Sequence, residues 1–89
     1  MENTHLESRD FYFCAYLYSQ NVKLLRHWRE KGITTFIFEK SDKLEELTKQ
    51  YYGMEATVNP VVYGQSLKNL KSIIYSNANE QYTSTRANR

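Results

Sequence analysis

The chain has 89 residues, of which 40% are hydrophobic and 25% charged, and its formal net charge is +2. This composition is typical of one soluble globular domain. No apolar run reaches the roughly 20 residues of a membrane span, and the polar residues up to Asp10 lack the apolar region of a signal peptide. The single cysteine cannot form an intramolecular disulfide and the net charge is too small to imply a polyanionic partner, so we expect a cytoplasmic protein.

The first predicted element is a helix from about Arg9 to Gln20, preceded by a flexible N-terminus over residues 1–7. Ser8 is typical of an N-cap, and Asp10 in the first turn complements the helix dipole. Asn21 favours the left-handed conformation that ends a helix. The apolar residues form two stripes, with Phe11, Cys14, Ala15 and Tyr18 in one and Phe13, Tyr16 and Leu17 in the other. So wide an apolar surface predicts a helix that is covered on two sides or presents aromatic residues to a partner.

The next segment, from Val22 to Lys40, predicts a β-hairpin. Residues 33–39 are rich in β-branched and aromatic side chains, which favours a strand. Its inner face is expected to carry Thr34, Phe36 and Phe38. Ile37 indicates that the other face is at least partly covered. Residues 22–29 fit either a helix that ends at Gly32 or a strand that leads to a three- or four-residue turn with Gly32 at positive φ, and the pattern alone does not decide between them.

Two further helices are predicted after the hairpin. One begins with Ser41 or Asp42 as its N-cap and ends at Gly53. The other begins at Asn59-Pro60, with asparagine as the cap and proline at the first helical position. From residue 77 to residue 89 the composition is polar, which predicts a disordered tail.

Three segments of this sequence together resemble a known family. They are SRDFYFCAYL from Ser8, FIFEKSDKLEELTKQYY from Phe36, and the Asn59-Pro60 start with LKNLK and IIY after it. They are similar to a domain of unknown function that is found in small proteins of bacteria and often of phage and other mobile elements, and the resemblance covers about residues 8–76.

Members of this family have a helix, a glycine-turned hairpin that ends in an F-x-F strand, and two further helices. The resemblance therefore implies a strand for residues 22–29. This sequence departs from the family at Gln20-Asn21, where a glycine is usual, and in the basic residues of its first strand. The family has no established activity or catalytic residues, so the resemblance implies a fold and no mechanism.

We therefore predict a single α+β domain over residues 8–76, with the order α-β-β-α-α. A two-stranded antiparallel hairpin is expected to pack against three helices. The predicted core consists of Phe11, Ala15, Tyr18, Leu24, Phe36, Phe38, Leu44, Leu47, Tyr51, Tyr63, Leu67, Leu70 and Ile74.

The sequence contains no glycine-rich phosphate loop, no metal-spaced Cys/His set and no recognisable nucleophile-base arrangement. Cys14 is expected to be a small core residue. His27 has no partner that the sequence identifies, and we expect an ordinary surface or cross-strand histidine. We accordingly predict no catalytic residues, metal, cofactor or small-molecule substrate, and a non-enzymatic binding or accessory protein.

The basic residues suggest a nucleic-acid-binding surface. The candidates are Lys23, Arg26, His27, Arg29 and Lys31 on the first strand, with Lys68, Lys71 and Tyr75 on the last helix. If the two surfaces meet, the cations would neutralise phosphates while Trp28 or a tyrosine stacks on an unpaired base. Alternatively, the cations protect a strand edge from aggregation, and Trp28 belongs to the core.

A protein partner or a homodimer is the competing prediction. The chain has eight tyrosines and an unusually apolar first helix, and tyrosine is common in interfaces. Pairing of a free hairpin edge across a dimer is a further alternative. A contiguous positive face without acids would favour nucleic acid, whereas exposed aromatic residues with mixed charge would favour protein. We predict protein interaction as the function and nucleic-acid binding as the alternative.

Overall fold

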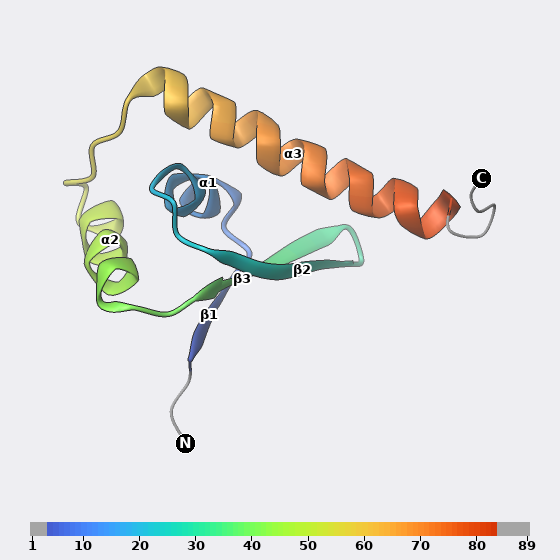
Figure 1. Cartoon of the computed structure of the whole chain (residues 1–89), viewed down its shortest axis with the longest axis horizontal. Helices are drawn as coiled ribbons and strands as arrows, with labels where there is room; N and C mark the ends of the chain where they lie inside the picture. Colours follow the sequence, from blue (N-terminus) through green and yellow to red (C-terminus); the bar gives the residue numbers. More distant parts are fainter. Residues whose placement is uncertain (1–3, 84–89) are drawn as a thin grey trace.

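The computed structural model describes the backbone of residues 4–83 and the side chains of residues 4–75. In chain order its elements are β1 (His5–Ser8), α1 (Phe11–Ser19), β2 (Leu24–Glu30), β3 (Ile33–Glu39), α2 (Asp42–Tyr52) and α3 (Pro60–Thr83) (Figure 1). The chain is α+β with three helices, as predicted, but its sheet has three strands instead of two. Helix α3 continues past the predicted end at residue 76, and residues 84–89 of the predicted disordered tail lie outside the described residues.

Strand β1 lies where we predicted a flexible N-terminus, and it makes β3 the central strand. The sheet order is β1-β3-β2, with both pairs antiparallel. Leu6 of β1 pairs with Phe38, and Ser8 pairs with Phe36. Because β3 has a neighbour on each side, residues 34–38 are all buried. The sequence did not indicate β1, because a four-residue strand with one apolar side chain carries too short an alternation to recognise.

The β2–β3 turn has only two residues, Lys31 at φ 53° and Gly32 at φ 80°, and Glu30 pairs directly with Ile33. Positive φ at both central positions defines a type I′ turn, whose twist matches that of the flanking strands. The turn is therefore shorter than the three or four residues predicted. Residues 24–30 form a strand, as the family resemblance implied.

A β-bulge interrupts the start of β2. Leu24 pairs with Phe38, whereas Arg26 pairs with the adjacent residue Ile37, so Leu25 is an extra residue on the β2 side. Beyond such a bulge, every side chain of the strand lies on the opposite face from the one that strict alternation predicts.

The bulge moves Trp28 out of the core. Directly paired residues share a face of the sheet, so His27 and Arg29 lie on the face that carries the phenylalanine side chains of β3, and Arg26 and Trp28 lie on the other. A core position for Trp28 was one of the two interpretations of this strand. The structure contradicts it, because the core and the residues packed against it do not include Trp28.

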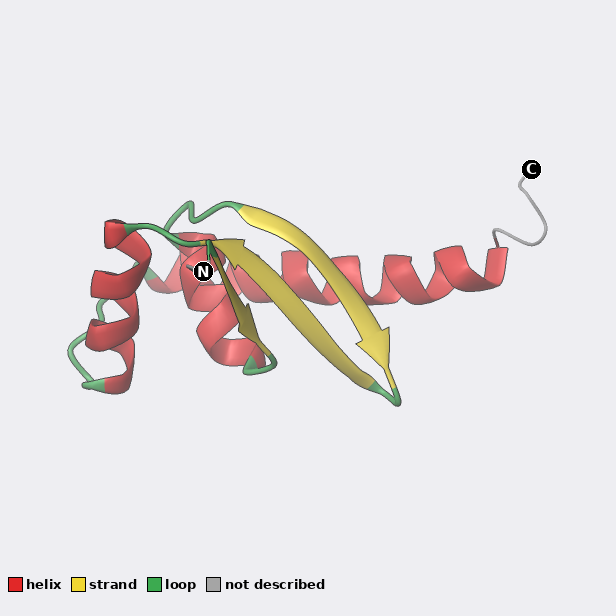
Figure 2. Cartoon of the chain, turned by 90° about the horizontal axis from the view of Figure 1, so that it is seen from below, coloured by secondary structure: helices red, strands yellow, loops and turns green. Residues whose placement is uncertain are grey.

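Helices α1 and α3 lie on one face of the sheet, and among the described residues no helix lies over the other face (Figure 2). The covered face carries Phe36 and Phe38, as predicted. Ile37 lies on the uncovered face, yet its side chain is only 1% exposed. Its partners in the two flanking strands are Glu7 and Arg26, so their side chains lie beside it on this face. Ile37 is therefore buried although no described helix lies over this face.

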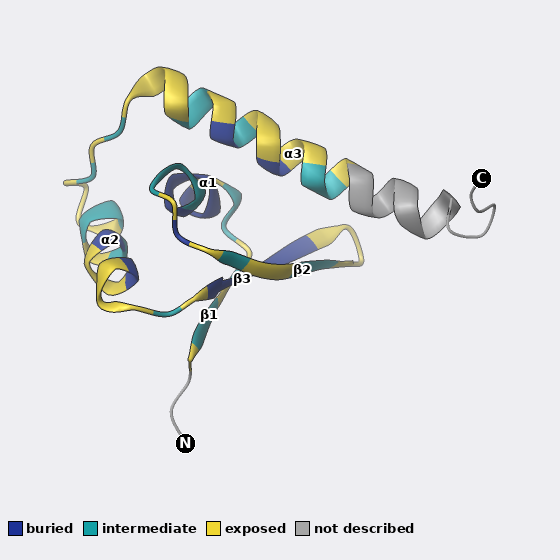
Figure 3. Ribbon diagram, viewed as in Figure 1, coloured by how far each residue is buried: buried dark blue, intermediate teal, exposed yellow. Residues whose placement is uncertain are grey.

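The core lies between the sheet and the helices (Figure 3). All the predicted core residues belong to it or pack against it. The structure adds Val22 and the second stripe of α1, since Phe13, Tyr16 and Leu17 are all buried. Helix α1 is therefore covered on two sides, which was one of the two predicted explanations for its apolar circumference.

The helix ends confirm some predicted caps and correct one. Asp10, and not Ser8, caps α1, with its Oδ1 accepting from the Phe13 N–H at 3.2 Å. Ser8 is held in β1, where its Oγ accepts from the Asp10 N–H at 3.1 Å. Of the two candidates for α2, Ser41 is the cap. Asn21 has φ 65°, the left-handed conformation predicted for it.

Candidate functional site

The predicted basic residues of β2 and its turn do not share one surface. Arg26 lies on the uncovered face of the sheet, with its guanidinium carbon 5.7 Å from the centre of the Trp28 ring. His27 and Arg29 lie on the helix-covered face. Lys31 is in the hairpin turn. The bulge and the pleat therefore divide a group of cations that is continuous in sequence.

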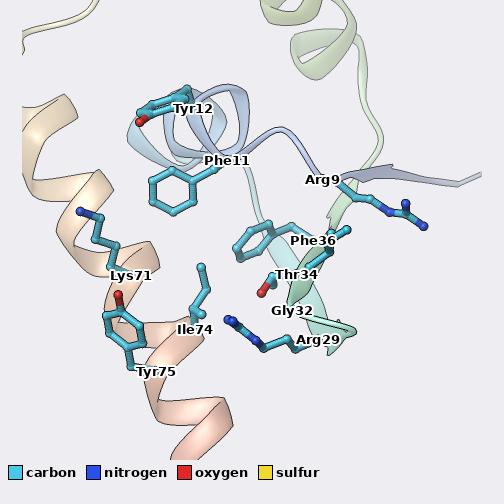
Figure 4. A pocket seen from close by; sticks show the side chains of 11 residues that line it. Arg9, Phe11, Tyr12, Arg29, Gly32, Thr34, Phe36, Lys71, Ile74 and Tyr75 are labelled. Carbon is cyan, nitrogen blue, oxygen red and sulfur yellow. The ribbon is translucent and has the colours of Figure 1, made fainter.

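Arg29 is the cation of β2 that meets α3. A cleft of about 420 Å³ lies between the start of α1, the end of the β2–β3 hairpin and the middle of α3 (Figure 4). Of the predicted residues it brings together Arg29, Lys71 and Tyr75. The other predicted residues, which are Lys23, Arg26, His27, Lys31 and Lys68, do not line it. The complete lining is Arg9, Phe11, Tyr12, Arg29, Gly32, Ile33, Thr34, Phe36, Lys71, Ile74 and Tyr75.

Three elements contribute apolar side chains to this cleft: Phe11 comes from α1, Phe36 from β3 and Ile74 from α3. Phe36 is only 1% exposed, so it forms a fixed floor that belongs to the core. The Thr34 hydroxyl points into the cleft beside it (Figure 4). The floor therefore combines a wide apolar surface with one hydroxyl.

The rim of the cleft is aromatic and cationic. Tyr12 and Tyr75 are 60% and 62% exposed, so both side chains are open to solvent at the rim. The Arg29 side chain extends toward Ile74 on α3, whereas the Arg9 guanidinium is directed away from the centre of the cleft (Figure 4). Among the described lining residues there is no Asp or Glu to balance these cations. Cations beside a low-dielectric apolar surface attract anions, so the cleft is suited to an anionic ligand.

Other tyrosines have structural roles that account for part of the tyrosine content. The Tyr52 hydroxyl donates to Asp10 Oδ2 at 2.9 Å and so joins α2 to the cap of α1. Burial and this hydrogen bond raise the pKa of Tyr52 to about 12. The Tyr63 hydroxyl donates to the Tyr12 carbonyl at 3.1 Å and joins α3 to α1, and burial raises its pKa. The side chains of Tyr12 and Tyr75 are exposed and available to a ligand in the cleft.

Two further reactive side chains lie outside the cleft. Cys14 is fully buried, as predicted, and burial raises the pKa of its thiol to about 12, so a thiolate does not form at neutral pH. His27 is half-buried on the covered face, where its ring centre lies 6.2 Å from that of Phe36. Its Nδ1 is buried and has no hydrogen-bond partner within the described part of the chain. His27 is thus a cross-strand residue with its Nδ1 directed into the protein, and it does not line the cleft.

Within residues 4–75, whose side chains the structure describes, no three His, Cys, Asp or Glu residues are grouped so that they could hold a metal ion. None of the described helices is both long enough and apolar enough to cross a membrane. The cleft is therefore the feature of the described structure on which a functional argument rests.

Eight of the eleven lining residues were not predicted as site residues. Among them, Arg9, Phe11 and Tyr12 lie just before and at the start of α1, and their approach to the hairpin depends on tertiary packing that local patterns do not contain. A weak signal was present, since Arg9 and Tyr12 are a cation and an aromatic residue three positions apart at a helix start.

Comparison with known families shows a match over residues 3–76 to the model described as "Domain of unknown function (DUF5659)". Because the match covers most of the chain, the chain belongs to this family. No curated protein and no solved structure matches the sequence.

Proposed function

We propose that this member of the DUF5659 family is a small, non-enzymatic accessory protein that binds an anionic group of a macromolecular partner in the cleft between α1, the hairpin and α3. The observation that carries the proposal is that Arg29 of the hairpin and Lys71 of α3 line the same cleft, with no acidic residue among its described lining residues. The exposed Tyr12 and Tyr75 lie on the same rim. The cleft therefore contains residues from both features of the sequence that suggested binding, the basic residues and the tyrosines.

A binding role fits the chemistry of the cleft better than a catalytic one. Its described lining contains hydroxyls of Thr34, Tyr12 and Tyr75, but none of the His, Asp, Glu or Cys side chains that serve as general bases or activated nucleophiles near neutral pH. Cys14 is shielded by the core. We place the protein in the cytoplasm, since its only cysteine is buried and unpaired. The origin in a bacterium, a phage or another mobile element follows only from the resemblance of its sequence to the family.

Sheet extension across a homodimer receives less support. The edge strand β2 carries a bulge, and its cations include the exposed Arg26 and Arg29, which are features that protect an edge against pairing. The other edge strand, β1, has only four residues. We therefore favour a partner that enters the cleft.

The proposal is tested with two labelled polyanions, a glutamate-rich peptide and an oligonucleotide, in fluorescence anisotropy titrations. We expect at least one of them to bind at low salt and the double variant Arg29→Ala/Lys71→Ala to lose this binding. Lys43→Ala/Lys49→Ala is the matched control, because it removes the same charge from exposed positions of α2 outside the cleft. Equal losses in both double variants, or binding of neither probe, would contradict the proposal.

A further inference from the structure

We propose that the partner is a single-stranded nucleic acid, and that the cleft takes one nucleotide, with its phosphate on Arg29 and Lys71 and its base on the aromatic rim. This inference rests on the proposed function, because it names the class of ligand for the same site. It follows from four features of the cleft: its cations, its aromatic rings, its size and the cations next to it.

The two cations come from facing elements. Arg29 is on the hairpin and Lys71 is on α3. The Arg29 guanidinium extends toward α3, whereas the Lys71 ammonium is directed away from Arg29 (Figure 4). The flexible lysine side chain therefore turns toward Arg29 when an anion binds between them. A guanidinium offers a planar set of donors that matches two phosphate oxygens, and an ammonium adds a compact charge. The Thr34 hydroxyl, which points into the cleft, supplies a further hydrogen-bonding group (Figure 4).

The aromatic residues distinguish a nucleotide from a simple anion. Tyr12 and Tyr75 expose ring faces on which a base can stack, and Phe11 and Ile74 extend the apolar surface beneath them. Stacking of this kind accepts any base, because every base has a π face. A ligand that carries both a planar ring and an anion in one repeating unit uses the whole lining, and a nucleotide is such a unit.

The shape of the site favours a single strand over a duplex. A cleft of about 420 Å³ is the size of a small-molecule site. Reading a DNA duplex requires an element that protrudes into a groove, whereas here the ligand must enter a hollow between elements. The bases of a single strand are free to turn into such a hollow.

Cations on either side of the cleft extend the site along a strand. Lys68 is exposed one turn before Lys71 on α3, and Lys31 is exposed in the hairpin turn after Arg29. Neighbouring phosphates of the strand would contact these side chains. With roughly three to four phosphates neutralised, the slope of log K against log salt is about −2 to −3 for a single strand.

The test uses the full chain and three fluorescein-labelled probes in anisotropy titrations: an oligothymidine on the order of ten nucleotides long, a duplex of equal length, and a glutamate-rich peptide. We expect the oligothymidine to bind more tightly than the duplex. Tyr75→Ala should weaken its binding by roughly 5- to 150-fold, although it leaves the net charge unchanged. Arg29→Ala should reduce the salt slope by about 0.7, and Lys49→Ala, on the exposed surface of α2, should not.

The outcomes separate this inference from the proposed function. Binding of the peptide but not of the oligothymidine would overturn the inference and leave the proposed function in place, with a protein partner. Binding of no probe would overturn both. Oligothymidine binding that is indifferent to Tyr75→Ala and Arg29→Ala would overturn the assignment of the cleft. Circular dichroism of each variant verifies folding, and the exposed position of Tyr75 and Arg29 predicts native spectra.

Discussion

Replacing Asp10 by alanine removes two interactions at once, and their sizes follow from the structure. Oδ1 of this residue caps α1 through the Phe13 N–H, and Oδ2 accepts the Tyr52 hydroxyl at 2.9 Å. Loss of an N-cap typically costs about 1 kcal/mol. A hydrogen bond to a carboxylate is worth roughly 1.5–3 kcal/mol in a buried site, but Tyr52 is 58% exposed, so we assign this one about 1 kcal/mol or less.

We therefore expect Asp10→Ala to lower the free energy of unfolding by about 2 kcal/mol. Asp10→Asn should lose less than about 1 kcal/mol, because asparagine is an equally good cap. Urea denaturation followed by circular dichroism measures both. A double-mutant cycle of Asp10→Ala with Tyr52→Phe isolates the hydrogen bond.

Ser8→Ala provides the decisive comparison, since the sequence pattern named Ser8 as the cap and the structure names Asp10. Ser8 Oγ accepts one N–H, at 3.1 Å, so its loss should cost about 1 kcal/mol. A larger loss in Ser8→Ala than in Asp10→Ala would refute the assignment of the cap.

Three further predictions concern the turn, the thiol and alkaline pH. Gly32→Ala should destabilise the protein by about 1–2 kcal/mol in urea denaturation, because φ is +80° at this position, although nothing lies within 4 Å of the added Cβ. Lys31→Ala, at the neighbouring exposed position of the turn, should be tolerated. Equal losses in the two variants would count against an effect of the glycine conformation. Cys14, which is fully buried with a pKa raised to about 12, should react with a thiol reagent only at the rate of unfolding, and fast labelling of the native protein would show that the core of α1 is open. The folded state raises the pKa of Tyr52 to about 12 from an ordinary value near 10, so its neutral form stabilises the fold below pH 10 and this stabilisation is lost as the pH rises from 10 toward 12. Tyr52→Phe should therefore flatten the decline of the unfolding free energy at alkaline pH. An unchanged decline would exclude Tyr52 as its source.

Much of the fold follows from local patterns. The F-x-F strand places Phe36 and Phe38 on the helix-covered face, and the predicted core positions are occupied as expected. The strand nature of β2 did not follow from the pattern, because Leu24 and Leu25 near its start fit a helical stripe as well as a strand. The family resemblance was needed to favour the strand.

Two features that local patterns could not supply determine the sheet. β1 is recognised only by its partner β3, since His5–Ser8 has a single apolar side chain. No characteristic residue in the sequence marks the bulge at Leu25, yet the bulge moves Trp28 to the uncovered face. Both depend on pairing between distant segments, and a strand pattern read alone assumes strict alternation.

The candidate site was predictable in part. Arg29 lines the cleft together with Lys71 and Tyr75, so part of the basic strand meets the last helix, which was the condition for the predicted nucleic-acid surface. Alternation and the bulge send Arg26 to the other face of the sheet, so it does not line the cleft. The predicted set also omitted Arg9, which only the packing of α1 brings to the cleft.

The most direct test of the cleft as the binding site is a two-dimensional ¹H–¹⁵N titration of the full chain with oligothymidine. We expect the largest shift changes at the amides of Arg29, Thr34, Lys71 and Tyr75, which belong to the cleft. The indole N–H of Trp28, the only tryptophan, lies on the opposite face of the sheet and should not move. Changes confined to Trp28 and Arg26, or no changes at all, would contradict the account.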